Sequence, residues 1–193
     1  MIFMADIVYT QPLKELLQVS TYFKEQLIVL VENEKDEKVA KTNDLIPCYL
    51  IKDSTPEAEI SKLSSKKKAV VGGSVKANEL AVRLKADYLL QPSNTKQFFD
   101  LGLAQKLSDN NTTVVLCFEE LLKANSFERH QVWKNYLELV RYCKQKKVKF
   151  IVASATKDPL LLRPPKVREA LAVLLGLPND LAKEYLSEVV KEK

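Results

Sequence analysis

Seven short apolar runs, separated by segments with helical periodicity, are the feature that most restricts the fold of this 193-residue chain. Several of the runs are apolar throughout, which is typical of strands whose two faces are both covered. Strands that alternate with helices predict a parallel sheet joined by right-handed crossovers. The expected strands are Ala5–Tyr9, Leu27–Glu32, Ile46–Ile51, Ala69–Val71, Tyr88–Leu90, Thr113–Phe118 and Lys149–Ala153.

An open doubly wound sheet and a closed barrel both satisfy this alternation. A barrel of eight strands usually needs about 250 residues and at least about 200, so this length allows only a trimmed or irregular barrel. No long linker, low-complexity tract or repeat divides the chain, and we expect one domain over residues 1–193. The polar segment Asn33–Asp44 and the tail after Val190 are expected to be flexible.

Helix-start signals lie in the segments between the strands. Ser74 and Asp100 are expected N-caps, Thr55 and Pro56 are expected to cap and start another helix, and Ser126 opens a longer one. These signals predict helices that alternate with the strands along the whole chain.

A further helix is expected after the last strand, beginning at Pro164 and Pro165 and ending at Gly176. Its apolar periodicity predicts which side chains face inward. These are Val167, Ala170, Leu171 and Leu174.

Positive charge is concentrated in one part of the sequence. The segment from Arg141 to Arg168 contains nine basic residues and one acidic residue, so it carries +8 against +5 for the whole chain and −3 for the remainder. The basic residues are Arg141, Lys144, Lys146, Lys147, Lys149, Lys157, Arg163, Lys166 and Arg168. A local positive field beside an ordered strand indicates a phosphate-rich partner, and a solvated lysine-rich face is the simpler alternative.

Three consecutive lysines, Lys66–Lys68, precede another expected strand. They are either loop charges that oppose pairing of strand edges or, if the fold brings them near the basic segment, an extension of the same surface.

Composition excludes several classes of protein. A hydrophobic content of 46% and a charged content of 28% are ordinary for a soluble globular domain. No run of about 18 apolar residues predicts a membrane span, and the N-terminus lacks a signal-peptide pattern, so we expect a cytoplasmic protein without a membrane partner. Cys48, Cys117 and Cys143 are expected to be buried reduced thiols, and with His130 as the single histidine no metal site is expected.

Gly72–Ser74 stands where a strand gives way to a helix, a place where backbone N–H groups can hold a phosphate. Neither G-x-G-x-x-G nor G-x-x-x-x-G-K-[ST] is present, so nucleotide-cofactor motifs are absent from the sequence. A tight turn that needs positive φ is the simpler interpretation.

Glu119 and Glu120 follow a strand at the end where barrel enzymes place catalytic carboxylates. They suit the charged first turn of a short helix equally well, and we favour that interpretation. His130 lies off the apolar stripe of its helix and is expected at the surface, and Ser154 and Thr156 lack a histidine to activate them. We therefore expect no catalytic residue in this chain.

Several segments follow one another in a recognisable order. They are Ala69–Ser74 (AVVGGS), Asn78–Val82 (NELAV), Ala86–Pro92 (ADYLLQP), Gly102–Leu107 (GLAQKL), Thr113–Phe118, Phe150–Ala155 (FIVASA), Leu162–Pro165 (LRPP) and Leu175–Leu177 (LGL). From Asp6 to Leu177 this succession resembles component 3 of the archaeal and eukaryotic ribonuclease P proteins, the thirty-kilodalton-class subunit. Leu162–Pro165 is the best marker, because the family typically has Leu-Arg-Ser-Pro there.

The resemblance implies an irregular, trimmed TIM-like (β/α) barrel of about seven strands inside a ring of helices, related to the polymerase-and-histidinol-phosphatase metal hydrolases. Those relatives begin with Asp-x-His-x-His on the first strand. If Asp6 is that aspartate, Val8 and Thr10 replace the histidines, and the three-metal site cannot be assembled by the known pattern.

The resemblance also implies a subunit of ribonuclease P, the endoribonuclease that removes the 5′ leader of precursor tRNA. The RNA subunit would carry the chemistry with bound Mg²⁺, while this chain binds no cofactor and holds the RNA by phosphate contacts from the nine basic residues. Arg163 is the first choice for a structured contact, because a guanidinium can grip phosphate bidentately; capping or bridging beside Pro164 is its alternative role.

The partners implied are ribonuclease P RNA, precursor tRNA and other protein subunits, including a small RRM-like one. Two alternative functions stay open. One is a phosphoesterase-like barrel enzyme for a small phosphorylated molecule, using Gly72–Ser74 and Glu119 or Glu120. The other is a protein-only assembly module whose basic residues face an acidic partner.

Overall fold

Seven parallel strands form one sheet in which the spatial order equals the order along the chain. The computed structural model describes residues 5–10, 13–23, 26–93 and 95–188, and the tail after Val190 lies outside them. The strands are β1 (Ala5–Tyr9), β2 (Gln26–Val31), β3 (Ile46–Ile51), β4 (Lys68–Val71), β5 (Tyr88–Leu90), β6 (Thr113–Cys117) and β7 (Phe150–Ala153). All seven predicted strands are confirmed to within one residue at each end.

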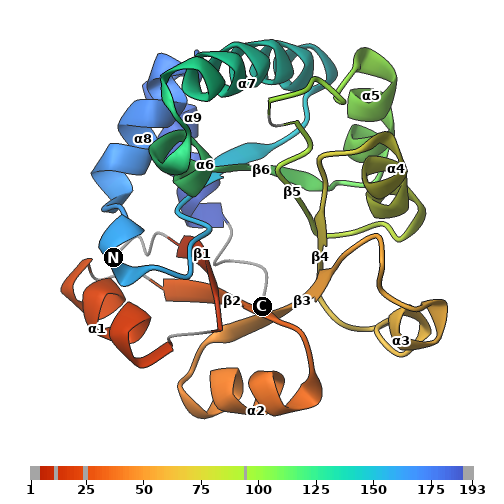
Figure 1. The fold of residues 1–193 in the computed structure, drawn as a ribbon, viewed down its shortest axis with the longest axis vertical. Helices are drawn as coiled ribbons and strands as arrows, with labels where there is room; N and C mark the ends of the chain where they lie inside the picture. The colour runs from red at the N-terminus through yellow and green to blue at the C-terminus, as the bar shows by residue number, and fades with distance from the viewer. Residues whose placement is uncertain (1–4, 11–12, 24–25, 94, 189–193) are drawn as a thin grey trace.

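The sheet curls into a nearly closed barrel, as Figure 1 shows down the barrel axis. The chain just after β7 reaches β1, where the Ala155 N–H donates to the Ile7 carbonyl at 2.9 Å and the Tyr9 N–H donates to the Thr156 carbonyl at 3.3 Å. Ala155 adopts a left-handed conformation, with φ of 48°, as it bridges this seam. These contacts decide for the barrel and against the open sheet.

Helices surround the strands (Figure 1). They are α1 (Leu13–Phe23), α2 (Glu34–Thr42), α3 (Glu57–Ser61), α4 (Val75–Arg83), α5 (Leu101–Asp109), α6 (Phe118–Lys123), α7 (Ser126–Lys146), the 3₁₀ helix η1 (Pro159–Leu161), α8 (Pro165–Leu174) and α9 (Asn179–Glu188). Among the described residues, no helix is long and apolar enough to cross a membrane.

The predicted helix starts are mostly confirmed. Ser74 and Asp100 cap α4 and α5 by accepting hydrogen bonds from backbone N–H groups three residues later. Helix α7 begins at Ser126, but its cap is Asn125, which forms a capping box with Glu128. The expected cap at Thr55 is wrong by one residue, because Pro56 occupies the N-cap position of α3.

The expectation of a flexible segment at Asn33–Asp44 is wrong, because most of it is helix α2. Asn33 caps the helix by accepting from the Asp36 N–H at 3.0 Å. Glu37 is buried and accepts from Lys41 and Lys66, both at 2.7 Å, and from the Tyr49 hydroxyl. These bonds, with that from Lys41 the largest cause, hold the pKa of Glu37 at about 2. Charged contacts, rather than an apolar stripe, fix this helix.

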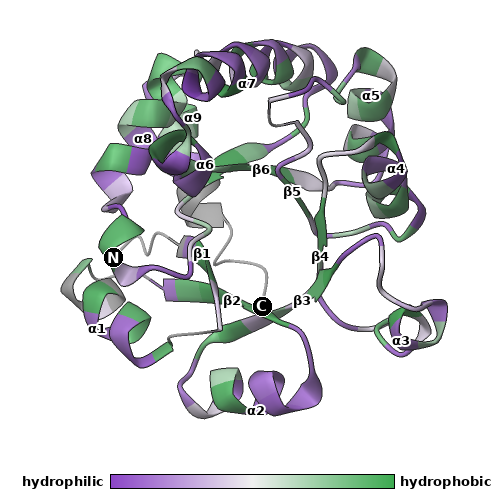
Figure 2. Cartoon of the chain, in the orientation of Figure 1, coloured by the Kyte–Doolittle hydropathy of each residue, from purple (hydrophilic) through white to green (hydrophobic). Residues whose placement is uncertain are grey.

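The core has an inner and an outer layer. Side chains such as Ile7, Leu30 and Tyr88 fill the barrel interior, while others such as Tyr136 and Phe150 pack between the strands and the helices. Figure 2 shows the apolar strands enclosed by helices in which hydrophilic and hydrophobic residues are mixed. Because all strands are parallel, their amino ends lie at one end of the barrel and their carboxyl ends at the other.

The three cysteines are free and buried, as expected. Burial raises the pKa of each thiol, which keeps all three in the neutral form.

Candidate nucleic-acid interface

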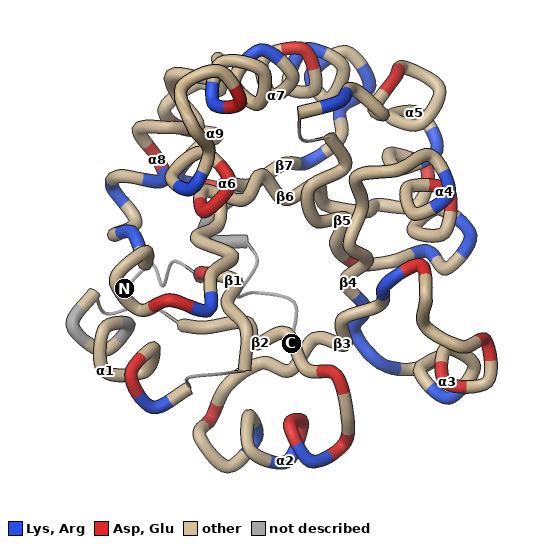
Figure 3. Tube along the Cα trace, viewed as in Figure 1, with Lys and Arg blue, Asp and Glu red and all other residues tan. Residues whose placement is uncertain are grey.

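Strand β7 divides the predicted basic residues between the two ends of the barrel. Figure 3, which looks down the barrel, shows Lys and Arg mostly on the helices and turns around it. Arg141, Lys144, Lys146, Lys147 and Lys149 precede the strand and lie toward its amino end. A second group, Lys157, Arg163 and Lys166, follows the strand and lies toward its carboxyl end. One flat surface therefore cannot contain all of them.

The amino-end group sits on the last turns of α7 and on the turn that leads into β7. Lys147 caps the helix in a left-handed conformation, with φ of 56° and ψ of 32°. Lys144 donates to the Gly176 carbonyl at 3.1 Å, and Arg141 pairs with Glu138 at 3.3 Å. Cations at a helix C-terminus interact favourably with its partial negative charge, so these positions also stabilise α7.

In the carboxyl-end group, the side chains of Lys157 and Arg163 contact other parts of the protein. The Lys157 ammonium lies 4.9 Å from the centre of the Tyr9 ring. Arg163 donates from Nη1 to the carbonyl oxygens of Leu160 at 2.9 Å and Leu162 at 3.0 Å. Arg163 therefore performs the bridging role that the sequence offered as its alternative. Lys166 is exposed in the first turn of α8.

Arg168 cannot contact RNA, so its prediction as an RNA-binding residue is wrong. Its side chain is 0% exposed, and its Nη1 lies 3.4 Å from Asp6 Oδ1. Its Nε donates to the Arg163 carbonyl at 3.2 Å. A phosphate outside the protein cannot reach this guanidinium.

The burial of Arg168 follows from the true inward face of α8. That face consists of Arg168, Leu171, Ala172 and Leu175, which are spaced as one helical stripe. Of the four residues predicted to face inward, only Leu171 is buried. Val167 is 41% exposed, Leu174 is 70% exposed and Ala170 is also exposed. Because Arg168 is charged, a search for apolar residues at helical spacing does not detect this buried face.

Asp6 joins three elements at the barrel seam. Its Oδ1 accepts from the Ile7 N–H at 2.8 Å and from the Ser154 N–H at 2.7 Å, in addition to facing Arg168. Ile7 points into the barrel, so alternation along β1 places Asp6 and Val8 on the outer side of the strand. The Asp6 carboxylate thus helps to close the barrel by linking β1 to Ser154 and Arg168, and it does not point into the barrel interior.

The structure supports the turn interpretation of Gly72–Ser74. Ser74 is occupied as the cap of α4, and Gly73 has φ of 91°. A Cβ on Gly72 would lie 2.5 Å from Asn78 Oδ1 and 2.8 Å from the Cα of Pro92, so only glycine fits. Asn78 Nδ2 donates to the Pro92 carbonyl at 2.9 Å and thereby ties the loop after β5 to α4. No motif in the sequence indicates this role of Asn78.

Glu119 and Glu120 open the short helix α6, as favoured from the sequence. Glu119 accepts from the Thr156 hydroxyl at 2.9 Å and pairs with Lys123 at 2.7 Å. Glu120 accepts from the Tyr136 hydroxyl at 2.8 Å. Burial raises the pKa of Glu120 to about 7, against the opposing effect of that hydrogen bond.

His130 is exposed on α7, as predicted. No three His, Cys, Asp or Glu side chains converge as a metal site requires in the part of the chain that the structure describes.

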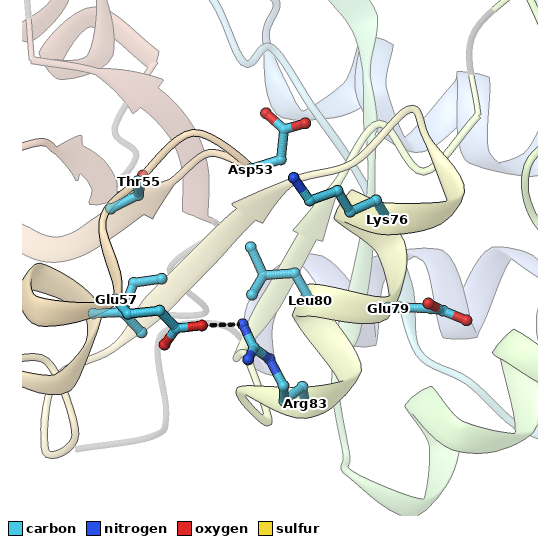
Figure 4. A pocket seen from close by; sticks show the side chains of 8 residues that line it. Asp53, Thr55, Glu57, Lys76, Glu79, Leu80 and Arg83 are labelled. Atoms are coloured by element: carbon cyan, nitrogen blue, oxygen red, sulfur yellow. Dashed lines mark hydrogen bonds and ion pairs between the residues drawn. The ribbon is translucent and has the colours of Figure 1, made fainter.

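Two hollows of mixed charge lie on the surface. One, of about 460 Å³, lies between α3 and α4 and contains the Arg83–Glu57 ion pair at 2.6 Å (Figure 4). The other, of about 610 Å³, lies at the carboxyl ends of β1 and β2 and includes Tyr9, Glu32 and Lys157. Only Lys157 of the predicted basic residues lines either hollow. Each hollow contains two cations together with two or three acids, so neither has the excess of positive charge that favours a phosphorylated small molecule.

Comparisons with known proteins agree with this picture of a barrel. A family model described as RNase P subunit p30 matches residues 54–192. Among solved structures, the chain is similar to one in a cryo-EM structure of archaeal ribonuclease P with mature tRNA, with a TM-score of 0.78 and 17% identity over 97% of this chain and 88% of that chain. At that identity the likeness concerns the fold. No curated protein sequence matches the chain.

Proposed function

We propose, from the premise that this chain belongs to the RNase P subunit p30 family, that it is a protein subunit of ribonuclease P and acts in the removal of the 5′ leader of precursor tRNA. The observation that carries the proposal is the family match over residues 54–192, which extends from the turn before α3 into the C-terminal region. The likeness of the fold to a chain of an archaeal ribonuclease P particle supports it.

The chemistry of cleavage belongs to the RNA subunit and its bound Mg²⁺ in this proposal. The barrel supplies a rigid body with exposed cations, which offset the repulsion between phosphates of a folded RNA. Eight of the nine predicted basic residues are not buried, and those among them that contact RNA depend on the end of the barrel at which the RNA binds: Arg141, Lys144, Lys146, Lys147, Lys149, Lys157, Arg163 and Lys166. Arg168 is used inside the protein instead.

The partners of the chain are then ribonuclease P RNA, precursor tRNA and further protein subunits, among them a small RRM-like one. A chain similar to this one occurs in a particle that contains mature tRNA, which supports partners of this kind. A cytoplasmic location accompanies the proposal.

Reconstitution tests the function. The cognate RNA and the other subunits are assembled with and without this chain, and leader cleavage is measured across a Mg²⁺ titration. We expect this chain to lower the Mg²⁺ concentration needed for cleavage, because fixed cations replace part of the ionic atmosphere.

An unchanged Mg²⁺ requirement contradicts the proposal. If the chain binds the other subunits equally well with and without the RNA, the protein-only assembly module is favoured. Hydrolysis of p-nitrophenyl phosphate by the purified chain favours the phosphoesterase-like barrel enzyme.

A further inference from the structure

Charge differs sharply between the two ends of β4, β5, β6 and β7. The helix ends and turns leading into these strands, residues 62–68, 83–87, 106–112 and 144–149, contain eleven basic and two acidic residues. The segments after the same strands, residues 72–75, 91–100, 118–125 and 154–164, contain four basic and four acidic residues. Two of the eleven cations, Lys66 and Arg83, pair with Glu37 and Glu57 outside these segments. The amino end of this half of the barrel still keeps a clear excess of positive charge, and the carboxyl end is neutral.

Backbone hydrogen bonds hold the amino ends of the four strands level with one another. The Asp87 N–H donates to the Lys68 carbonyl at 2.9 Å, and the Thr113 N–H donates to the Asp87 carbonyl at 2.9 Å. The Val114 N–H donates to the Lys149 carbonyl at 2.9 Å. Adjacent strands lie about 4.8 Å apart, so Lys68 and Lys149 are separated by about 14 Å along one rim. The fold thus brings Lys66–Lys68 to the same end of the barrel as the basic turn before β7.

Several cations on this rim are not neutralised by the protein. Lys85, Lys106, Lys146 and Lys147 form no ion pair with any residue that the structure describes. The carboxylate of Asp87, one of the two acids, is engaged by the Lys68 N–H at 2.8 Å. The positive field of the rim therefore extends into solvent.

Helix polarity does not account for the whole bias. The helices end at the amino end of the barrel, and cations are favourable at helix C-termini. Yet the corresponding turn after α2 carries Lys41 and Asp44 in equal number. Lys67 and Lys68 lie six and seven residues beyond the end of α3, next to the strand they precede, where the effect of a helix terminus has decayed.

The composition of the rim fits the backbone of a folded RNA. Its four turns contain no Phe, Tyr or Trp, so it offers no platform on which bases can stack. Ten of its eleven cations are lysines, which act on phosphates as point charges rather than as bidentate readers. Shape and backbone contacts are the usual means by which proteins hold structured RNA.

We propose that the amino end of β4–β7 is the surface that contacts RNA, with phosphates held across the rim from Lys67, Lys68 and Lys85 to Lys146, Lys147 and Lys149. This inference rests on the proposed function and deepens it, because it assigns the RNA to one end of the barrel. The carboxyl end, where barrel enzymes hold their substrates, is left without RNA contacts.

Two matched pairs of substitutions test the assignment. Lys85→Gln with Lys147→Gln removes two charges from the rim, and Lys157→Gln with Lys166→Gln removes two from the carboxyl end. Affinity for the cognate ribonuclease P RNA is measured across a salt titration, and unfolding in urea is followed for each variant. For the rim pair we expect the slope of log K against log salt to be shallower by about 1.4–1.8, and binding at about 0.1 M salt to be about 25- to 60-fold weaker.

The control pair at the carboxyl end is expected to match the wild-type slope and affinity. If the control pair weakens binding as much as the rim pair, or if only the control pair weakens it, the assignment of RNA to the amino end is overturned while the proposed function stands. If the wild-type chain neither binds the RNA nor alters its cleavage in the particle, the proposed function itself fails. A rim pair that loses stability but keeps the wild-type salt slope shows that the lysines serve the helix termini, and this too overturns the inference.

Discussion

Replacing Arg168 with methionine should destabilise the protein strongly, although the residue belongs to a segment that looks like a solvent-exposed basic face. The change leaves the Asp6 carboxylate buried without its guanidinium partner, whose Nη1 lies 3.4 Å away. At an effective dielectric constant of about 20, two unit charges at that distance attract by about 5 kcal/mol. Breaking such a buried pair by removing one partner costs about 3–5 kcal/mol.

The lower end of that range is the better expectation for this site. Asp6 Oδ1 keeps two backbone donors, from Ile7 at 2.8 Å and Ser154 at 2.7 Å, after Arg168 is gone. We therefore expect a loss of about 3 kcal/mol. With a urea m-value of about 2 kcal/mol/M, the midpoint of unfolding falls by about 1.5 M. Circular dichroism during a urea titration measures this directly.

A matched control and a double-mutant cycle isolate the ion pair. Lys166→Met is the control, since Lys166 is exposed in the same helix and its replacement should change the stability by less than about 0.5 kcal/mol. Asp6→Asn combined with Arg168→Met leaves no buried charge, so the double variant should lose about 2 kcal/mol less than the two single losses together. Additivity within about 0.5 kcal/mol, or a loss below about 1 kcal/mol for Arg168→Met, refutes the reasoning.

Three further predictions concern the supports of the fold. Gly72→Ala should cost about 1–3 kcal/mol, because its Cβ would lie 2.8 Å from the Cα of Pro92, whereas Gly102→Ala in α5 should be neutral or stabilising by up to about 1 kcal/mol; urea midpoints compare them. Burial raises the pKa of Glu120 from 4.5 to about 7. Between these two pH values the folded protein keeps a proton on Glu120 that the unfolded chain has lost, so the free energy of unfolding should fall as the pH rises. Glu120→Gln should remove this part of the pH dependence, and equal pH profiles for the two proteins would contradict it. The pKa of Glu37 is lowered from 4.5 to about 2, so its stabilising effect is present above 4.5 and is lost as the pH falls; Glu37→Gln should flatten the acid limb of the stability profile.

The strands were predictable because each is an apolar run of strand length whose flanking segments are polar or helical. Closure of the barrel was not, because it depends on Ala155 and Thr156, which follow the last strand and reach β1 only once the sheet has curled. Helix α2 was missed for a different reason. Its stability comes from the Asn33 cap and from buried Glu37, and neither contributes to a hydrophobic period.

The basic segment could be predicted from the sequence. Its division into a buried arginine and exposed cations at two ends of the barrel could not. Net charge counts residues without regard to the direction in which a side chain points, so Arg168 was grouped with Lys166 although one is buried and the other exposed. One signal was present in the sequence: Arg168 shares the spacing of Leu171, Ala172 and Leu175, and a lone acid interrupts the apolar first strand. A cation on an apolar stripe and an acid in an apolar strand together suggest a buried pair.

The burial of Arg168 also explains what the marker Leu162–Pro165 does in this protein. Leu162 is buried, the Arg163 N–H donates to the Ser154 hydroxyl at 3.1 Å, and the Arg163 carbonyl accepts from Arg168. Through Asp6, the same residues reach β1. The marker therefore fastens the end of β7 and the start of α8 to the first strand, so its most visible residues close the barrel at its carboxyl end. Cations committed in this way are poorly placed to contact the phosphates of an RNA. On the opposite rim, Lys85, Lys106 and Lys147 are exposed and form no ion pair with any residue that the structure describes. This contrast supports our assignment of the RNA to the amino end.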